Sequence, residues 1–240
     1  MDLDTKSEEL FVSICNRHGY RVEKLPTRSD QGLKTADFSI QTRDGRILAE
    51  VEELTPNSDD LRQIKKFEET GSTSAVGTIG SRARAAIRHA TLQLKNHCSE
   101  RVPMIAVLYD NVRTPNGRVA YPMYYLEHHH IDAAMYGDRI VPVPLGEDVT
   151  PRPDRSGGGR TTTQAEKNYL SAVAVISDWD DETMFVFHNS FAGIPLPVEV
   201  FSDSRCHHYR KGFDPHGEPW KWHPATEANK KVDSTDTTHL

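Results

Sequence analysis

The chain has 240 residues, of which 36% are hydrophobic and 27% are charged, and its formal net charge is -6. This composition predicts a globular protein with one large domain, and the negative balance argues against a generally basic nucleic-acid coat protein. No apolar run reaches the length of a membrane span, and the acidic N-terminus is unlike a signal peptide. We therefore expect a cytoplasmic protein with no membrane partner. Three widely separated cysteines favour reduced thiols over a disulfide framework: Cys15, Cys98 and Cys206.

The first predicted elements are a helix over 7–18 and a short strand over 20–25. The helix has one apolar face, with Ser7 as its expected N-cap. Glu8 lies at the border of that face. It is either a first-turn acid that complements the helix dipole or a side chain that reaches a neighbouring site.

A β-hairpin is predicted next, because two strand-like runs, 36–42 and 47–54, flank Asp44-Gly45. If this dipeptide forms a two-residue turn, Asp37 faces Glu52. Since side chains alternate along a strand, one face then carries three acids: Asp37, Glu50 and Glu52. Each pair of carboxylates at ~5 Å and an effective dielectric of ~20 repels by about 3 kcal/mol. Either open water or a divalent cation must relieve that repulsion, and the spacing leaves both alternatives open.

A short helix over 59–69, with Leu61, Ile64 and Phe67 on its buried side, and a flexible loop over 71–80 precede the strongest predicted helix, 81–97. Beside its apolar stripe this helix carries a basic stripe that includes Arg84, Arg88 and Lys95. A face of one sign suits a phosphate backbone, although a solvated basic face is the commoner case.

The second half of the chain is predicted to be rich in strands. Residues 102–110 are a continuous apolar run typical of a central strand covered on both faces. The other predicted elements are strands at 119–126 and 139–143, a helix at 127–136, a hairpin from 168–179 and 183–188, and an edge strand at 198–201.

Taken in order, the helix, strand, acidic hairpin, basic helix and buried strand resemble the PD-(D/E)xK nuclease superfamily over roughly residues 7–110. Ala36-Asp37 stands for the Pro-Asp element of that family, and Glu50-Val51-Glu52 stands for Glu-x-Lys. The resemblance implies an α/β (α+β) fold with a restriction-endonuclease-like αβββαβ core, a mixed central sheet and a C-terminal β-rich extension. The expected divisions are a nuclease-like core at 1–110, an extension of the same domain at 111–202 with a mobile loop near 142–163, and a polar, partly disordered tail at 203–240.

The resemblance also implies magnesium- or manganese-dependent hydrolysis of DNA phosphodiester bonds. Asp37 and Glu50 would ligate the metal, with the carbonyl of Val51 as an extra ligand. Glu52 would bind a second metal or orient the attacking water. Backbone phosphate of the nucleic acid would be held by the basic stripe: Arg84, Arg88 and Lys95. The chain is expected to bind DNA, and a homodimer is compatible with the family.

The sequence departs from the family pattern at Glu52, which occupies the position of the usual lysine. Some restriction enzymes of the superfamily are similar in carrying Glu-x-Glu there. A displaced positive charge could come from Lys34, Lys65 or Lys95, and Glu8 is a possible accessory acid. The alternative is a catalytically degenerate nuclease-fold module that binds nucleic acid or a protein partner without cleavage.

Two further clusters have weaker functional interpretations. Cys206-His207-His208 could bind zinc only with partners elsewhere in the chain, because no second Cys or His pair lies at finger spacing. Adjacent histidines at 128–130 lie on a predicted helix, where they point apart. A triad of Ser190, His188 and Asp203 lacks the supporting G-x-S-x-G turn.

Overall fold

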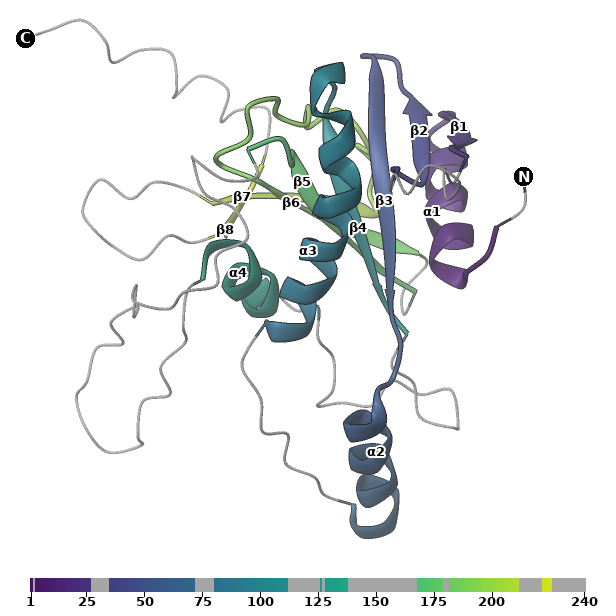
Figure 1. Cartoon of the computed structure of the whole chain (residues 1–240), viewed down its shortest axis with the longest axis vertical. Helices are drawn as coiled ribbons and strands as arrows, with labels where there is room; N and C mark the ends of the chain where they lie inside the picture. Colours follow the sequence, from purple (N-terminus) through teal and green to yellow (C-terminus); the bar gives the residue numbers. More distant parts are fainter. Residues whose placement is uncertain are drawn as a thin grey trace, which may run out of the picture.

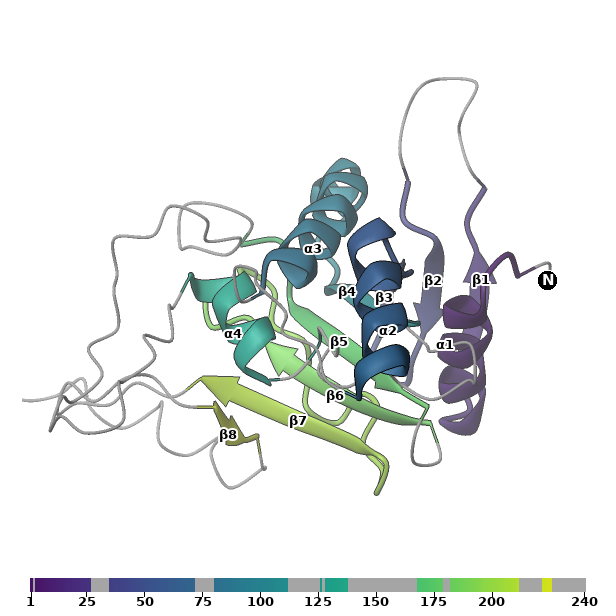
Figure 2. The same ribbon diagram turned by 90° about the horizontal axis from the view of Figure 1, so that it is seen from below.

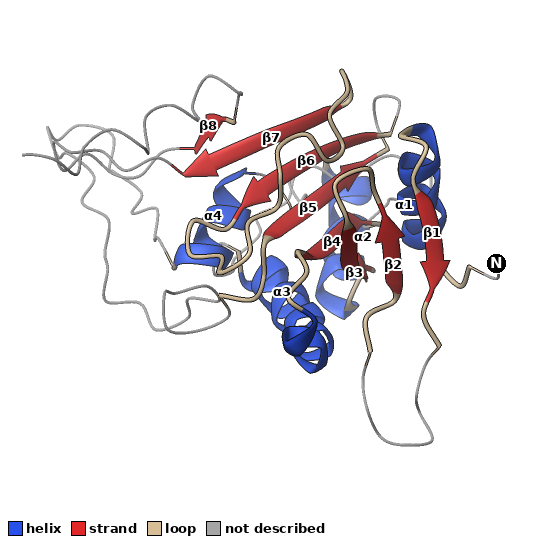
Figure 3. Cartoon of the chain, turned by 90° about the horizontal axis from the view of Figure 1, so that it is seen from above, coloured by secondary structure: helices blue, strands red, loops and turns tan. Residues whose placement is uncertain are grey.

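The computed structural model describes residues 1, 3–26, 35–71, 80–111, 126, 128–137, 168–178, 182–211 and 222–225. Within them, eight strands form one mixed sheet whose spatial order follows the sequence, as Figure 3 shows. The strands are β1 (Arg21–Lys24), β2 (Phe38–Gln41), β3 (Arg46–Leu54), β4 (Met104–Asp110), β5 (Ala172–Ser177), β6 (Thr183–His188), β7 (Cys206–Lys211) and β8 (Trp222–Pro224).

Three antiparallel strands, β1, β2 and β3, open the sheet, and β3, β4 and β5 are parallel to one another. Parallel neighbours require crossover connections, and helices lie in the connections from β3 to β4 and from β4 to β5. The helices are α1 (Lys6–Arg17), α2 (Ser58–Thr70), α3 (Ser81–Leu94), which continues as the 3-10 helix η2 (Lys95–Glu100), and α4 (His128–Tyr136). None of the described helices is long and apolar enough to cross a membrane.

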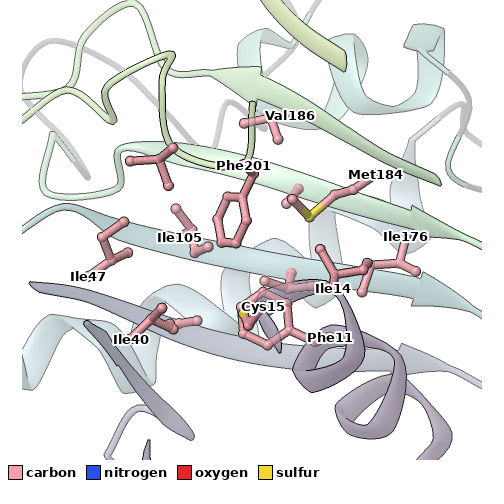
Figure 4. Packing of buried hydrophobic residues seen from close by; sticks show 14 of the residues in the cluster. Phe11, Ile14, Cys15, Ile40, Ile47, Ile105, Ile176, Met184, Val186 and Phe201 are labelled. Atoms are coloured by element: carbon pink, nitrogen blue, oxygen red, sulfur yellow. The ribbon is translucent and has the colours of Figure 1, made fainter. Parts of the chain in front are cut away.

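The sheet is covered on both faces, with α1 on one side and α3 and α4 on the other (Figure 2). The α1 side is packed by Phe11 and Ile14 against alternate strand residues and Phe201, as seen in Figure 4. All seven residues of β4 are buried, which confirms the predicted central strand. The described structure is therefore a mixed α/β fold around one sheet.

The predicted hairpin register is wrong by two residues. Gln41, not Arg43, pairs with Arg46, because four residues, 42–45, form the connection. Thr42 closes this longer turn: its N–H and hydroxyl both donate to the carbonyl of Gly45, at 2.9 and 2.8 Å. Gly45 has a φ of 138°, which a side chain would disfavour. A shift of two residues leaves every side chain on its predicted face.

Other predicted elements differ in detail. Thr5, not Ser7, is the N-cap of α1. Of the three apolar residues predicted on the buried side of α2, Ile64 is buried, while Leu61 and Phe67 are 56% and 40% exposed, because the helix stands away from the sheet (Figure 1). The predicted edge strand at 198–201 is a turn, and Phe201 within it has a φ of 59°.

The segment predicted as a polar tail, 203–240, contributes two strands to the sheet, β7 and β8. The predicted strand at 139–143, the mobile loop near 142–163 and residues 119–125 of another predicted strand lie outside the described residues.

Gly80 fixes the start of α3 against α4. Its φ is 71°, and a Cβ there would lie 2.5 Å from the backbone oxygen of His130. We expect Gly80→Ala to destabilise the protein by about 3 kcal/mol, because both the left-handed backbone and the collision oppose it. Gly71 has a φ of 70° with no heavy atom within 4 Å of such a Cβ. Gly71→Ala should therefore cost only about 1 kcal/mol in urea unfolding, and equal losses would contradict the packing described.

Candidate metal and nucleic-acid site

Asp37 and Glu50 face each other where β2 meets the middle of β3. The Asp37 backbone N–H donates to Glu50 Oε2 at 3.1 Å, and the Val51 N–H donates to Asp37 Oδ2 at 2.9 Å. The corrected register, with Phe38 opposite Ala49, thus brings these two acids closer than the predicted register would have done. Each carboxylate is oriented by a backbone donor of the neighbouring strand.

Both carboxyl groups lie in an environment that disfavours their charged forms. Glu50 is buried, and burial together with the nearby charges of Asp37 and Glu52 raises its pKa to about 9. Burial also raises the pKa of Asp37 to about 6, with Glu8 and Glu52 adding to the shift and the Val51 hydrogen bond opposing it. A cation bound between the two carboxyl groups would favour their charged forms and lower both pKa values.

Helix α3 packs over this acidic face. The His89 ring is hydrogen-bonded to Glu52, and the Gln93 amide donates to Glu50. Residues four apart on a helix rise about 6 Å, which matches the spacing of residues two apart on a strand at about 6.6 Å. The antiparallel course of α3 over β3, visible in Figure 1, therefore matches each helix residue to one acid.

The third predicted acid, Glu52, is set back from the other two. Its carboxylate bonds to His89, and Asp37, Glu50 and Glu52 do not place three ligand atoms within 4.8 Å of one another. Among the described residues, the group that meets this criterion is a different one: His18, Asp203 and Cys206. The acidic site is consequently a close pair with one acid at its border.

A lysine that sequence reasoning missed lies beside this pair. Lys24, on β1, donates to Glu8 Oε2 at 2.9 Å and to Asp4 Oδ2 at 2.7 Å, and its charge acts on Asp37. Although burial opposes it, these hydrogen bonds raise the pKa of Lys24, so the amine remains protonated. Glu8 is buried at the start of α1, and its charge acts on Asp37.

The Val51 carbonyl is also placed for a role here. In a strand, the N–H and C=O of one residue point to the same side. The Val51 N–H reaches Asp37, so the Val51 carbonyl points to the same side of β3 as that N–H.

The predicted basic stripe divides into two parts. Arg84 donates to the Ala133 carbonyl of α4 at 2.8 Å, so it packs the helices together. Arg88 and Lys95 are exposed on α3 and η2. Lys65, on α2, is exposed and 3.9 Å from Glu69, and Lys34 lies outside the described residues.

Lys24, His89 and Gln93 carried no recognisable signal in the sequence. The spacing of His89 and Gln93 on one helix face matches alternate strand acids only once the packing of α3 on β3 is known. No protein-family model, curated protein or solved structure matches the chain.

Proposed function

We propose that the chain is a metal-dependent nuclease that hydrolyses DNA phosphodiester bonds at Asp37 and Glu50. The observation that carries the proposal is the pair itself. The buried Glu50 accepts the Asp37 backbone N–H, and the half-buried Asp37 accepts the N–H of Val51, the residue after Glu50. Two neighbouring carboxylates that are withdrawn from water repel each other, and a bound cation would offset that repulsion.

The order of elements supports a restriction-endonuclease-like arrangement. The series α1, β1, β2, β3, α3 and β4 matches the αβββαβ core of that family, with α2 as an additional helix. Asp37 directly precedes β2 and Glu50 lies on β3, near the positions where the family carries its Asp and Glu-x-Lys motifs.

The residues present fit a hard divalent cation. Asp37 and Glu50 offer carboxylate oxygens and Val51 a carbonyl oxygen, which are the ligands that magnesium and manganese prefer. A cation held there would polarise a phosphoryl oxygen and lower the pKa of bound water.

Lys24 provides the positive charge that the Glu-x-Glu motif lacks. Its protonated amine lies close enough to act on Asp37 and is anchored by Glu8. In the proposed reaction Lys24 stabilises negative charge on the scissile phosphate. Glu52, held by His89, orients water at the border of the site.

Cleavage assays test this proposal directly. Supercoiled plasmid and single-stranded DNA would be incubated with magnesium or manganese and the wild-type chain, Asp37→Ala, Lys24→Met or Glu69→Gln. We expect Asp37→Ala to lose at least about 100-fold in rate and Lys24→Met about 10- to 100-fold. Glu69→Gln, which removes an exposed acid on α2, should cleave like the wild type. Absence of metal-dependent cleavage by the wild type on every substrate would reject the nuclease.

Arg88 and Lys95 are exposed and free to contact DNA, whereas Arg84 is engaged with α4. Replacing Arg88 or Lys95 by alanine should weaken DNA binding at every sequence and reduce the salt slope of log K by about 1 each. Arg84→Ala should leave the salt slope unchanged and lower the melting temperature, because its guanidinium bonds to α4. Fluorescence anisotropy at several salt concentrations measures both. Equal slopes in all variants would place the DNA elsewhere.

The second candidate is a nuclease-fold module that binds DNA without cutting it. The bond between Glu52 and His89 favours it, since an acid committed to a histidine is less available for chemistry. Binding that depends on Arg88 and Lys95, without cleavage in any metal, would support the module.

A further inference from the structure

A second group of metal-binding side chains lies far from the acidic pair. His18 follows α1, Asp203 precedes β7, and Cys206 is the first residue of β7. His18 Nε2 is 3.1 Å from Asp203 Oδ2 and 3.5 Å from Cys206 Sγ, and the three ligand atoms all lie within 4.8 Å of one another. No metal-binding partners for Cys206 could be identified from the sequence. The fold brings His18 and Asp203 close to it.

The distances fit a coordination polyhedron. With bonds of about 2.0–2.3 Å to nitrogen, oxygen and sulfur, neighbouring corners of a tetrahedral zinc site are about 3.3–3.8 Å apart. The separations of 3.1 and 3.5 Å therefore require only small adjustments. A nitrogen, a carboxylate oxygen and a sulfur form a ligand set suited to zinc rather than to magnesium.

The imidazole is already held in place. The His18 ring stacks on Tyr20 at 5.4 Å between centroids and meets Phe201 edge-on at 5.6 Å. Asp203 is likewise held, because its Oδ1 accepts the Arg205 N–H at 2.7 Å. Ligands fixed by their surroundings lose little conformational freedom on binding a metal.

Arg17 is a cation that touches the group. Its Nε lies 3.0 Å from Asp203 Oδ2, and its Nη2 lies 3.8 Å from Cys206 Sγ. Glu182 faces the same guanidinium at 3.8 Å and offsets its charge. The charges of Zn²⁺, one thiolate and one carboxylate sum to zero. The metal-bound group would therefore not repel the guanidinium of Arg17.

We propose that His18, Asp203 and Cys206 form a zinc site that ties the end of α1 to the start of β7. Binding forms a bond from the metal to His18 Nε2, Asp203 Oδ2 and Cys206 Sγ and releases the thiol proton to solvent. The fourth position is left to water. Cys206 also lines a pocket of about 430 Å³. The site is independent of the proposed nuclease activity.

Cobalt titration of the full chain, stripped of metal by a chelator, tests the site. One equivalent of Co²⁺ should produce a thiolate-to-cobalt charge-transfer band and visible d–d bands of tetrahedral strength, and Zn²⁺ should abolish both. Cys206→Ser should lose the charge-transfer band, while His18→Ala should weaken Co²⁺ binding at least about tenfold and keep the band at saturation.

Two matched controls separate this site from other thiols and from the acidic pair. Cys98→Ser changes an exposed cysteine and should titrate like the wild type. Glu50→Gln should also retain the full cobalt spectrum. Circular dichroism establishes that each variant is folded, and Asp203→Asn provides a second test if Cys206→Ser is not, with weaker binding expected. A wild type without the charge-transfer band at excess Co²⁺, or a band that depends on Cys98 instead of Cys206, would overturn the proposal.

Discussion

Glu50→Gln is expected to stabilise the metal-free protein at pH 8 while it abolishes metal-dependent cleavage. The pKa of Glu50 is raised from 4.5 to about 9, so the folded state retains a proton that the unfolded state releases above about pH 4.5. Stability from this group is therefore full at low pH and declines as the pH rises toward 9. Removing the ionisable group should recover on the order of 5 kcal/mol at pH 8.

Glutamine can keep both hydrogen bonds of Glu50. Its carbonyl can accept from the Asp37 N–H, and its amide can donate to Gln93 if the Gln93 amide is flipped. Urea unfolding at pH 6, 7 and 8 in the presence of a chelator measures the effect. A variant whose stability falls with pH as steeply as that of the wild type would contradict the raised pKa. Glu69→Gln is the control for a simple change of net charge.

Acid should unfold the protein through a buried histidine pair. His188 Nε2 lies 2.9 Å from His208 Nδ1 between β6 and β7, and burial lowers the pKa of His188 to about 3 and that of His208 to about 4. The unfolded state binds more protons than the folded state between those values and 6.5. Stability is thus full above pH 6.5 and is lost as the pH falls, by on the order of 8 kcal/mol once both groups have titrated.

Replacing both His188 and His208 by leucine should remove most of this loss of stability at acid pH. The same replacement at His207, an exposed neighbour on β7, should leave it unchanged. Circular dichroism during acid titration compares the three proteins. If the double variant and the wild type unfold at the same pH, another group controls acid stability.

The sequence allowed the central strand and the acidic face to be predicted for different reasons. β4 is apolar almost throughout, so its burial follows from composition. The acids were placed on one face correctly although the predicted register was wrong by two residues, because side chains alternate with a period of two along a strand. The turn itself was mispredicted because the Thr42 side chain extends it beyond Asp44-Gly45.

The polar strand β7 could not be predicted from local pattern. Its sequence, Cys-His-His-Tyr-Arg-Lys, has too few apolar residues, yet His208 and Lys211 are buried. Their partners lie far away in sequence: His188 bonds to His208, and Asp132 lies 2.5 Å from Lys211. Lys24 was missed for the same reason, since its place beside Asp37 depends on the pairing of β1 with β2.

Manganese binding tests the role of Asp37 and Glu50 most directly. Calorimetric titration of Mn²⁺ would compare the wild type with Asp37→Asn and Glu69→Gln, each in a Cys206→Ser background that removes the sulfur ligand of the zinc site. We expect the parent and Glu69→Gln to bind one Mn²⁺ with equal affinity, and Asp37→Asn to lose at least about tenfold. Equal binding by all three proteins would show that the acidic pair does not hold the metal.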